Sequence, residues 1–117
     1  LLSNSLKRHK ELSLKELKSY DESSWFKEII TKASIIQKEA ANIDEMPIIS
    51  GIIDNRIKKK MKLQMDGALN YAEFSHIKVT AKRVKEDNTT FNTYKHIGLP
   101  TSPVSSVSIM AIKAAIN

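Results

Sequence analysis

Glu39 is the residue whose type and surroundings best suit acid–base chemistry. It lies in the segment KASIIQKEAANIDEMP, which is typical of helix, and its neighbours three and four positions away are Ile35, Ile36, Asn42 and Ile43. No cation therefore occupies a position from which it would form a helical salt bridge with this glutamate. An apolar environment raises the pKa of a carboxyl group toward the value that a general acid needs near neutral pH. The pattern makes Glu39 a candidate acid, although a surface glutamate beside an apolar stripe gives the same pattern.

Other familiar catalytic and metal-binding patterns are missing from the sequence. The chain has no cysteine, which excludes a catalytic thiol, a thiolate zinc site and a disulfide framework. His9, His76 and His96 lie far apart and lack the paired spacing of a zinc-binding helix. There is no glycine-rich phosphate loop and no nucleophile elbow. We therefore expect no metal site.

The net charge favours acidic partners. The 117 residues include 19 Lys and Arg against 13 Asp and Glu, which gives a formal net charge of +6. Such an excess suits nucleic acid, anionic lipid or an acidic cell-wall polymer, and it does not choose among them. The basic run IKKKMK has no interleaved aromatic residues and is typical of a solvated helix end.

The length suits one domain with its own hydrophobic core. No apolar run approaches the roughly 20 residues of a membrane-spanning helix, and no signal peptide is present. The sequence starts at Leu1 rather than Met, and an apolar helical pattern still continues at Asn117. We therefore expect a piece of a longer protein, in which residues 1–24 form an amino-terminal amphipathic helical segment.

Three longer helices are expected to build the core. The first runs from residue 25 to about 42, the second begins near Pro47, and the third starts near Ser106 or Ser108. A short helix capped by Thr80 is predicted between the second and the third. The residues expected on the buried sides of the three longer helices are Phe26, Ile29, Ile30, Ala33, Ile36, Ala40, Ile48, Ile49, Ile52, Ile53, Ile57, Ile109, Ile112 and Ile116.

Two short segments have the alternation of strands. MKLQMD, residues 61–66, would present Gln64 and Asp66 on its polar side, and SHIKVT, residues 75–80, would be its partner. Residues 88–106 are rich in Pro, Gly, hydroxyl and amide side chains, which predicts an ordered polar loop. The expected fold class is therefore α+β: a helix-rich single domain with a small antiparallel β element, an ordered polar loop and Glu39 on a helix.

Four blocks of the sequence, ASIIQKEA, IIDNRIKKKMKLQMD, FNTYKHIGLPTSPV and AIKAAIN, follow one another in a distinctive order and spacing. Together they resemble the catalytic domain of the YceG-like family, the MltG-type endolytic murein transglycosylases. The resemblance covers residues 25–117, and four separated blocks are far more specific than any one of them. It implies that residues 25–117 are a YceG-like catalytic domain.

The resemblance also implies the site. Glu39 aligns with the catalytic glutamate of the family, whose helix motif resembles A-S-I-I-E-K-E, with Gln37 in place of the first glutamate. The family commonly has Pro-Thr where this chain has Gly67 and Ala68, and often has Tyr where Phe91 stands. The residues that the resemblance implies for substrate binding are Asn55, Arg56, Gln64, Asp66, Asn92 and Tyr94.

The implied reaction is non-hydrolytic cleavage of the MurNAc–GlcNAc bond of peptidoglycan, which leaves 1,6-anhydro-MurNAc ends. A hydrolytic glycosidase generally uses two carboxylates. Here one suffices, because the muramic acid's own C6 hydroxyl attacks C1 while Glu39 acts first as acid and then as base. The resemblance implies that no cofactor is needed. It implies glycan strands and cell-wall synthesis proteins as partners, and no nucleic acid. It also implies a place on the periplasmic side of a bacterial inner membrane, anchored by a helix that this chain lacks.

Two alternatives stay open at the level of sequence. The charge alone also fits a non-enzymatic basic module that binds glycan or nucleic acid, whose affinity would fall steeply with salt and would ignore Glu39→Gln. The presence of Gln37 and the altered turns also fit a family member that binds glycan without turnover.

Overall fold

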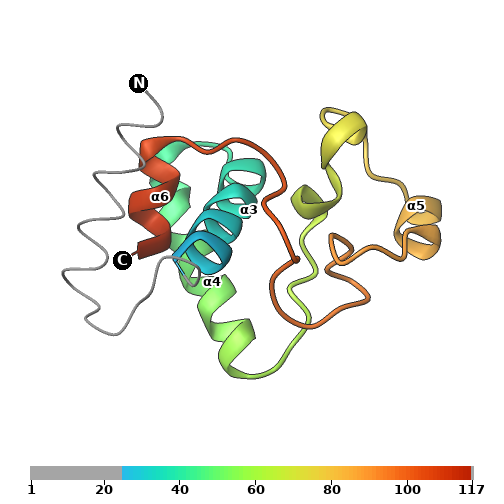
Figure 1. Ribbon diagram of the computed structural model, residues 1–117, viewed down its shortest axis with the longest axis horizontal. Coiled ribbons are helices and arrows are strands. Elements are labelled where there is room, and N and C mark those ends of the chain that lie inside the picture. Colours follow the sequence, from blue (N-terminus) through green and yellow to red (C-terminus); the bar gives the residue numbers. More distant parts are fainter. Residues whose placement is uncertain (1–24, 117) are drawn as a thin grey trace.

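The computed structural model describes residues 25–116, and the predicted helical segment 1–24 lies outside the described residues. The described chain is helix-rich, as predicted. Helices α3, α4 and α6 pack together at one end of the molecule and α5 lies at the other end (Figure 1). In chain order the elements are η1 (Trp25–Ile30), α3 (Thr31–Glu39), η2 (Ile43–Glu45), α4 (Met46–Lys58), η3 (Asp66–Leu69), η4 (Ala72–Phe74), α5 (Ala81–Glu86) and α6 (Ile109–Ile116).

Helix α3 is the centre of the core. It packs against η1, α4, η3 and α6, and residues 31–36 are all buried. The apolar residues predicted for its inner face, Ala33 and Ile36, are fully buried, and so is Ile35, which the predicted stripe omits. The stripe is therefore too narrow, because neighbours cover this part of the helix on every side.

Two buried polar side chains of α3, Lys32 and Ser34, find partners on neighbouring elements. The Lys32 ammonium donates to the Ala115 carbonyl oxygen at 2.9 Å and pairs with Asp54 Oδ1 at 2.8 Å. Ser34 Oγ accepts a hydrogen bond from the Val104 N–H at 2.9 Å. A buried polar group costs free energy unless it is hydrogen-bonded, so these contacts hold α3 in one position against α4, α6 and the loop before α6.

Helix α4 has a narrower buried face than predicted. Pro47 lies in its first turn, as expected. Ile53 is fully buried, but Ile48 is 62% exposed and Ile57 is 38% exposed. The prediction for these two isoleucines is wrong, because α4 contacts α3 and α6 along one side only.

Helix α6 packs against α3 through small residues. Its buried residues are Ile112 and three alanines at positions 111, 114 and 115, whereas the predicted core residue Ile109 is 39% exposed. Ser108 Oγ accepts a hydrogen bond from the Ala111 N–H at 3.2 Å, so Ser108 begins this helix as predicted.

The first predicted strand, residues 61–66, does not form. Residues 25–116 contain one isolated antiparallel bridge, between Lys62 and Ile97, and no strand. The φ angle of Gln64 is +54°, in the left-handed region, and interrupts any continuous ladder. The alternation in the sequence is nevertheless real, because Leu63 and Met65 are buried while Gln64 between them is exposed.

The second predicted strand, residues 75–80, is also absent. The φ angle of His76 is +69°, and Ile77, the residue expected to face the core, is 51% exposed. The predicted cap that follows is confirmed, because Thr80 Oγ1 accepts a hydrogen bond from the Arg83 N–H at 3.2 Å and α5 begins at the next residue.

The loop between α5 and α6 contains no helix or strand and is tied to residues 64–65. Thr93 Oγ1 accepts from the Met65 N–H at 2.9 Å and donates to the Met65 carbonyl at 3.0 Å. The Thr93 carbonyl accepts from the Gln64 N–H at 3.1 Å. Two irregular segments therefore run together beside α3 with little repetitive secondary structure.

We expect Lys32→Ala to lower the free energy of unfolding by about 2 to 3 kcal/mol, because the Ala115 carbonyl loses a charged donor and the core loses the lysine's hydrocarbon chain. Asp54→Asn is the matched control: the Asp54 side chain is 58% exposed, so its loss should cost under about 1 kcal/mol. Urea unfolding followed by circular dichroism measures both. Equal losses would contradict a dominant role of the lysine–carbonyl bond.

Candidate active site

Glu39 is the last residue of α3, and Ala40 after it has an extended backbone. The side chain is half-buried, and its Oε2 accepts a hydrogen bond from the Gly67 N–H at 3.1 Å. Within residues 25–116, Glu39 has no ion-pair partner and no hydrogen bond to Oε1. The carboxylate is thus held by one oxygen, and the other is available to a ligand.

Asp66 and Tyr94 form a second part of the site. The Tyr94 hydroxyl donates a hydrogen bond to Asp66 Oδ1. This bond, together with burial and the negative charges of Asp66 and Glu39, raises the pKa of Tyr94 to about 12, while Arg56 opposes the shift. Glu39 therefore lies within electrostatic reach of the Tyr94 hydroxyl, which stays neutral and acts as a donor at physiological pH.

We expect one tyrosine component in a near-ultraviolet titration to ionise near pH 12 and to vanish in Tyr94→Phe. A raised pKa means that the neutral hydroxyl is favoured in the folded state. The stabilisation is therefore complete below the ordinary pKa of 10.0 and is lost as the pH rises through about 12. Ionisation of every tyrosine near the ordinary value would contradict the Tyr94–Asp66 bond.

Arg56 and Gln64 lie at the edge of this cluster, and Asn55 stands apart. The Arg56 guanidinium donates to the Leu63 carbonyl oxygen, which fixes the chain just before Gln64. The Gln64 side chain is exposed. Asn55 is exposed on α4, and no contact within the described chain joins its side chain to Glu39, Asp66 or Tyr94.

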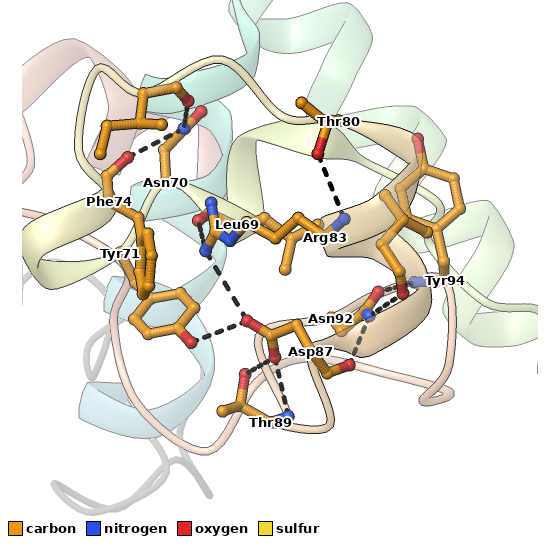
Figure 2. Close-up of polar contacts among 12 residues, drawn as sticks. Leu69, Asn70, Tyr71, Phe74, Thr80, Arg83, Asp87, Thr89, Asn92 and Tyr94 are labelled. Carbon is orange, nitrogen blue, oxygen red and sulfur yellow. Dashed lines mark hydrogen bonds and ion pairs between the residues drawn. The ribbon is translucent and has the colours of Figure 1, made fainter.

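Asn92 is fully buried and bonded to its own chain (Figure 2). Its Nδ2 donates to the carbonyl oxygens of Val84 and Asp87, each at 2.7 Å, and its Oδ1 accepts from the Tyr94 N–H at 3.2 Å. These bonds hold the backbone of Tyr94 against the end of α5. They support a structural role, and the substrate contact predicted for Asn92 stays a prediction.

A second polar network around Asp87 supports the same loop (Figure 2). Asp87 accepts hydrogen bonds from the Tyr71 hydroxyl at 2.8 Å and from the Thr89 hydroxyl at 2.6 Å. The Arg83 guanidinium lies 3.7 Å from Asp87 Oδ2 and 3.8 Å from the centre of the Phe74 ring. Burial by itself raises the pKa of Asp87, but the bonds from Thr89 and Tyr71 and the charge of Arg83 hold it below the ordinary value.

We expect Asp87→Asn to be less stable than the unaltered protein near neutral pH and to approach it in acid. A carboxyl whose pKa is lowered by folding contributes stability above its ordinary value of 3.8, and this contribution is lost as the pH falls through the lower native value. Urea unfolding across the acid range measures the difference. A gap that stays constant with pH would show that Asp87 is not held as a carboxylate.

Two hollows lie near the site, and Glu39 itself is not among the residues that line them. Lys38, which precedes Glu39, lines the larger hollow, and Asp66, which precedes Gly67, lines the smaller; their volumes are about 710 and 440 Å³. Asn70 and His76 line both hollows. The larger hollow is completed by Gln37, Ser75, Ser105, Ser106, Val107 and Ser108, and the smaller one by Ile77, Lys78 and Val79.

Hydroxyl, amide and ammonium groups dominate the larger hollow, and such groups suit a ligand rich in hydroxyl and amide groups. The described residues include no group of three or more acidic or histidine side chains arranged for a metal ion. No helix among them is long and apolar enough to cross a membrane.

Comparison with known proteins identifies the family. The matching sequence model is described as the YceG-like family, and the match covers residues 1–117. The chain belongs to the YceG-like family. The resemblance predicted from the four sequence blocks is thereby confirmed.

Relatives and a solved structure agree with this family. The YceG-like chain is 34% identical over 95 residues to a Streptococcus pneumoniae serotype 2 protein, and 33% identical over 89 residues to a Bacillus subtilis protein. Both relatives are named endolytic murein transglycosylase, and the alignments cover 77% and 76% of this chain but only 17% and 25% of theirs. A crystal structure of a YceG-like protein from Listeria monocytogenes matches with a TM-score of 0.73 and 36% identity, over 91% of this chain and 33% of that one.

The structure adds two residues to the site of this YceG-like chain. Thr93 joins two irregular segments, and Gly67 contacts the Glu39 carboxylate. In the sequence Gly67 stands out only as a departure from the family pattern. A glycine beside residues predicted to bind substrate was the available signal, since such a position often permits a close backbone approach.

Proposed function

We propose that this YceG-like protein is an endolytic lytic transglycosylase that cleaves the MurNAc–GlcNAc bond of peptidoglycan strands. One observation carries the proposal: a half-buried Glu39 has one oxygen held by a backbone amide and one oxygen without a bond within the described chain. The names of the relatives support murein as the substrate class. The proposal includes residues 25–117 as the catalytic domain and a location at the cell wall.

The reaction requires one group that first gives and then accepts a proton. Glu39 protonates the glycosidic oxygen as the bond from C1 to that oxygen breaks, and the GlcNAc hydroxyl leaves. The C6 hydroxyl of the same muramic acid then attacks C1, and its proton passes to the Glu39 carboxylate. A 1,6-anhydro ring forms, no water is consumed, and the acid is regenerated.

The surrounding residues would bind the strand and stabilise charge. Asp66 supplies negative charge beside the acid, which favours the positive charge that develops at C1 in the transition state. Gln64 and Tyr94 would contact sugar hydroxyl and N-acetyl groups, and Arg56 would hold a lactyl or peptide carboxylate. In the same proposal Asn55 extends the binding surface, and Asn92 contributes through the backbone of Tyr94.

We expect Glu39→Gln to reduce the formation of 1,6-anhydro ends by at least about 100-fold, because an amide can neither give nor accept this proton. Purified peptidoglycan strands are incubated with each protein, and the products are identified by mass spectrometry. An anhydro end is lighter than a hydrolysed end by one water. Glu86→Gln is the matched control, because it makes the same change at an exposed position on α5 and should leave activity unchanged.

Intact strands with the unaltered protein would overturn the enzymatic proposal. A Glu39→Gln variant that cleaves as fast as the Glu86→Gln control would overturn the role of Glu39. Tight binding of nucleic acid, with an affinity that falls steeply with salt and is unchanged by Glu39→Gln, would instead support a basic binding module.

A further inference from the structure

Gly67 makes an unusually close approach to the Glu39 carboxylate. Its N–H lies 3.1 Å from Oε2. A Cβ atom added to Gly67 would lie 2.9 Å from that oxygen and 3.0 Å from the Cβ of Lys38. Real Cβ atoms essentially never approach a neighbour within 3.0 Å. The carboxylate therefore occupies space that a side chain at residue 67 would need.

The close approach at Gly67 comes from the absence of a side chain and not from a left-handed backbone. Gly98 is the described glycine with a positive φ, +86°, whereas Gly67 lies in η3 with an ordinary φ. A Cβ added at Gly51, in α4, would meet nothing within 4 Å. Gly67 thus differs from both other glycines, because a side chain there would meet both the Glu39 carboxylate and Lys38.

We propose that Gly67, which stands where the family commonly has a proline and hence no N–H, is a positioning residue for the acid in this chain: its N–H fixes Oε2 of Glu39 and leaves Oε1 as the oxygen that exchanges the proton. This inference rests on the proposed function of Glu39.

Activity measurements test this role with a matched pair of variants. We expect Gly67→Ala to lower kcat at least about tenfold with KM within about twofold, because displacement of a reacting group by about 1 Å costs rate and not ground-state binding. Gly51→Ala adds the same methyl group in open space and should match the unaltered protein.

A double-mutant cycle separates positioning from general damage. Glu39→Asp shortens the side chain and withdraws the carboxylate from residue 67. In that background Gly67→Ala should cost several-fold less than in the unaltered protein, because the contact with the carboxylate is already gone and only the contact with Lys38 remains. Losses that simply multiply would overturn the inference.

A nuclear magnetic resonance experiment needs no change at residue 67. The chain has three glycines, so labelling with ¹⁵N-glycine gives three backbone amide signals, two of which serve as internal controls. The Gly67 amide proton should shift as Glu39 ionises, and this shift should vanish in Glu39→Gln. A pH-independent Gly67 signal in the unaltered protein would overturn the contact even if Gly67→Ala fails to fold.

The outcomes distinguish the inference from the function on which it rests. Full activity of Glu39→Gln would overturn the proposed function. An inactive Glu39→Gln together with a Gly67→Ala variant as active as Gly51→Ala would overturn the role of Gly67 alone.

Discussion

The burial of α3 on every side is the constraint on which the rest of the structure depends. Residues 31–36 are all buried, although they include a lysine, a serine and a threonine. The Lys32 ammonium must reach Asp54 and the Ala115 carbonyl, and Ser34 must meet the Val104 N–H. These contacts leave the helix little freedom to slide or rotate, because each shift would leave a buried polar group without its hydrogen-bond partner. The position of the helix end, and with it Glu39, is set by the core.

The site forms where irregular chain meets that fixed end. Gly67 approaches the carboxylate from one segment, and Tyr94 comes from another that Thr93 ties to Met65. Irregular backbone can direct amide and hydroxyl donors at a side chain, because its own groups are not all used in a ladder. Fixing an irregular backbone in one conformation costs conformational entropy, and the hydrogen bonds around Asn92 and Asp87 offset this cost. The polar networks away from Glu39 thus support the geometry beside it.

A single held carboxylate also fits the proposed non-hydrolytic reaction better than a pair would. A hydrolase must position and activate water, which usually requires a second carboxylate at a set distance. Asp66, the acidic residue beside Glu39, already accepts a bond from the neutral Tyr94 hydroxyl, so it suits charge stabilisation more than activation of water. An attack by a hydroxyl of the substrate itself removes the need for that second base.

Much of the helical framework could be predicted from the sequence by itself, because helix periodicity and caps are local. The core positions of α3, the first-turn proline of α4, and the capping roles of Thr80 and Ser108 all follow from neighbours within a few residues. The four sequence blocks also predicted the family correctly. Local pattern made Glu39 a candidate acid, whereas its assignment as the catalytic residue and its six companions rest on that resemblance.

Only the tertiary structure decided what long-range contacts control. The alternation of apolar and polar residues over 61–66 shows only that every second side chain is buried. An irregular segment in which Gln64 has a left-handed backbone conformation produces the same alternation as a strand. Local pattern did not show that Lys32 would be buried, because its partners lie on two other helices. It also could not bring Gly67 to Glu39, 28 residues away. Periodicity encodes which residues avoid water, whereas the atom that each polar group meets depends on how the whole chain packs.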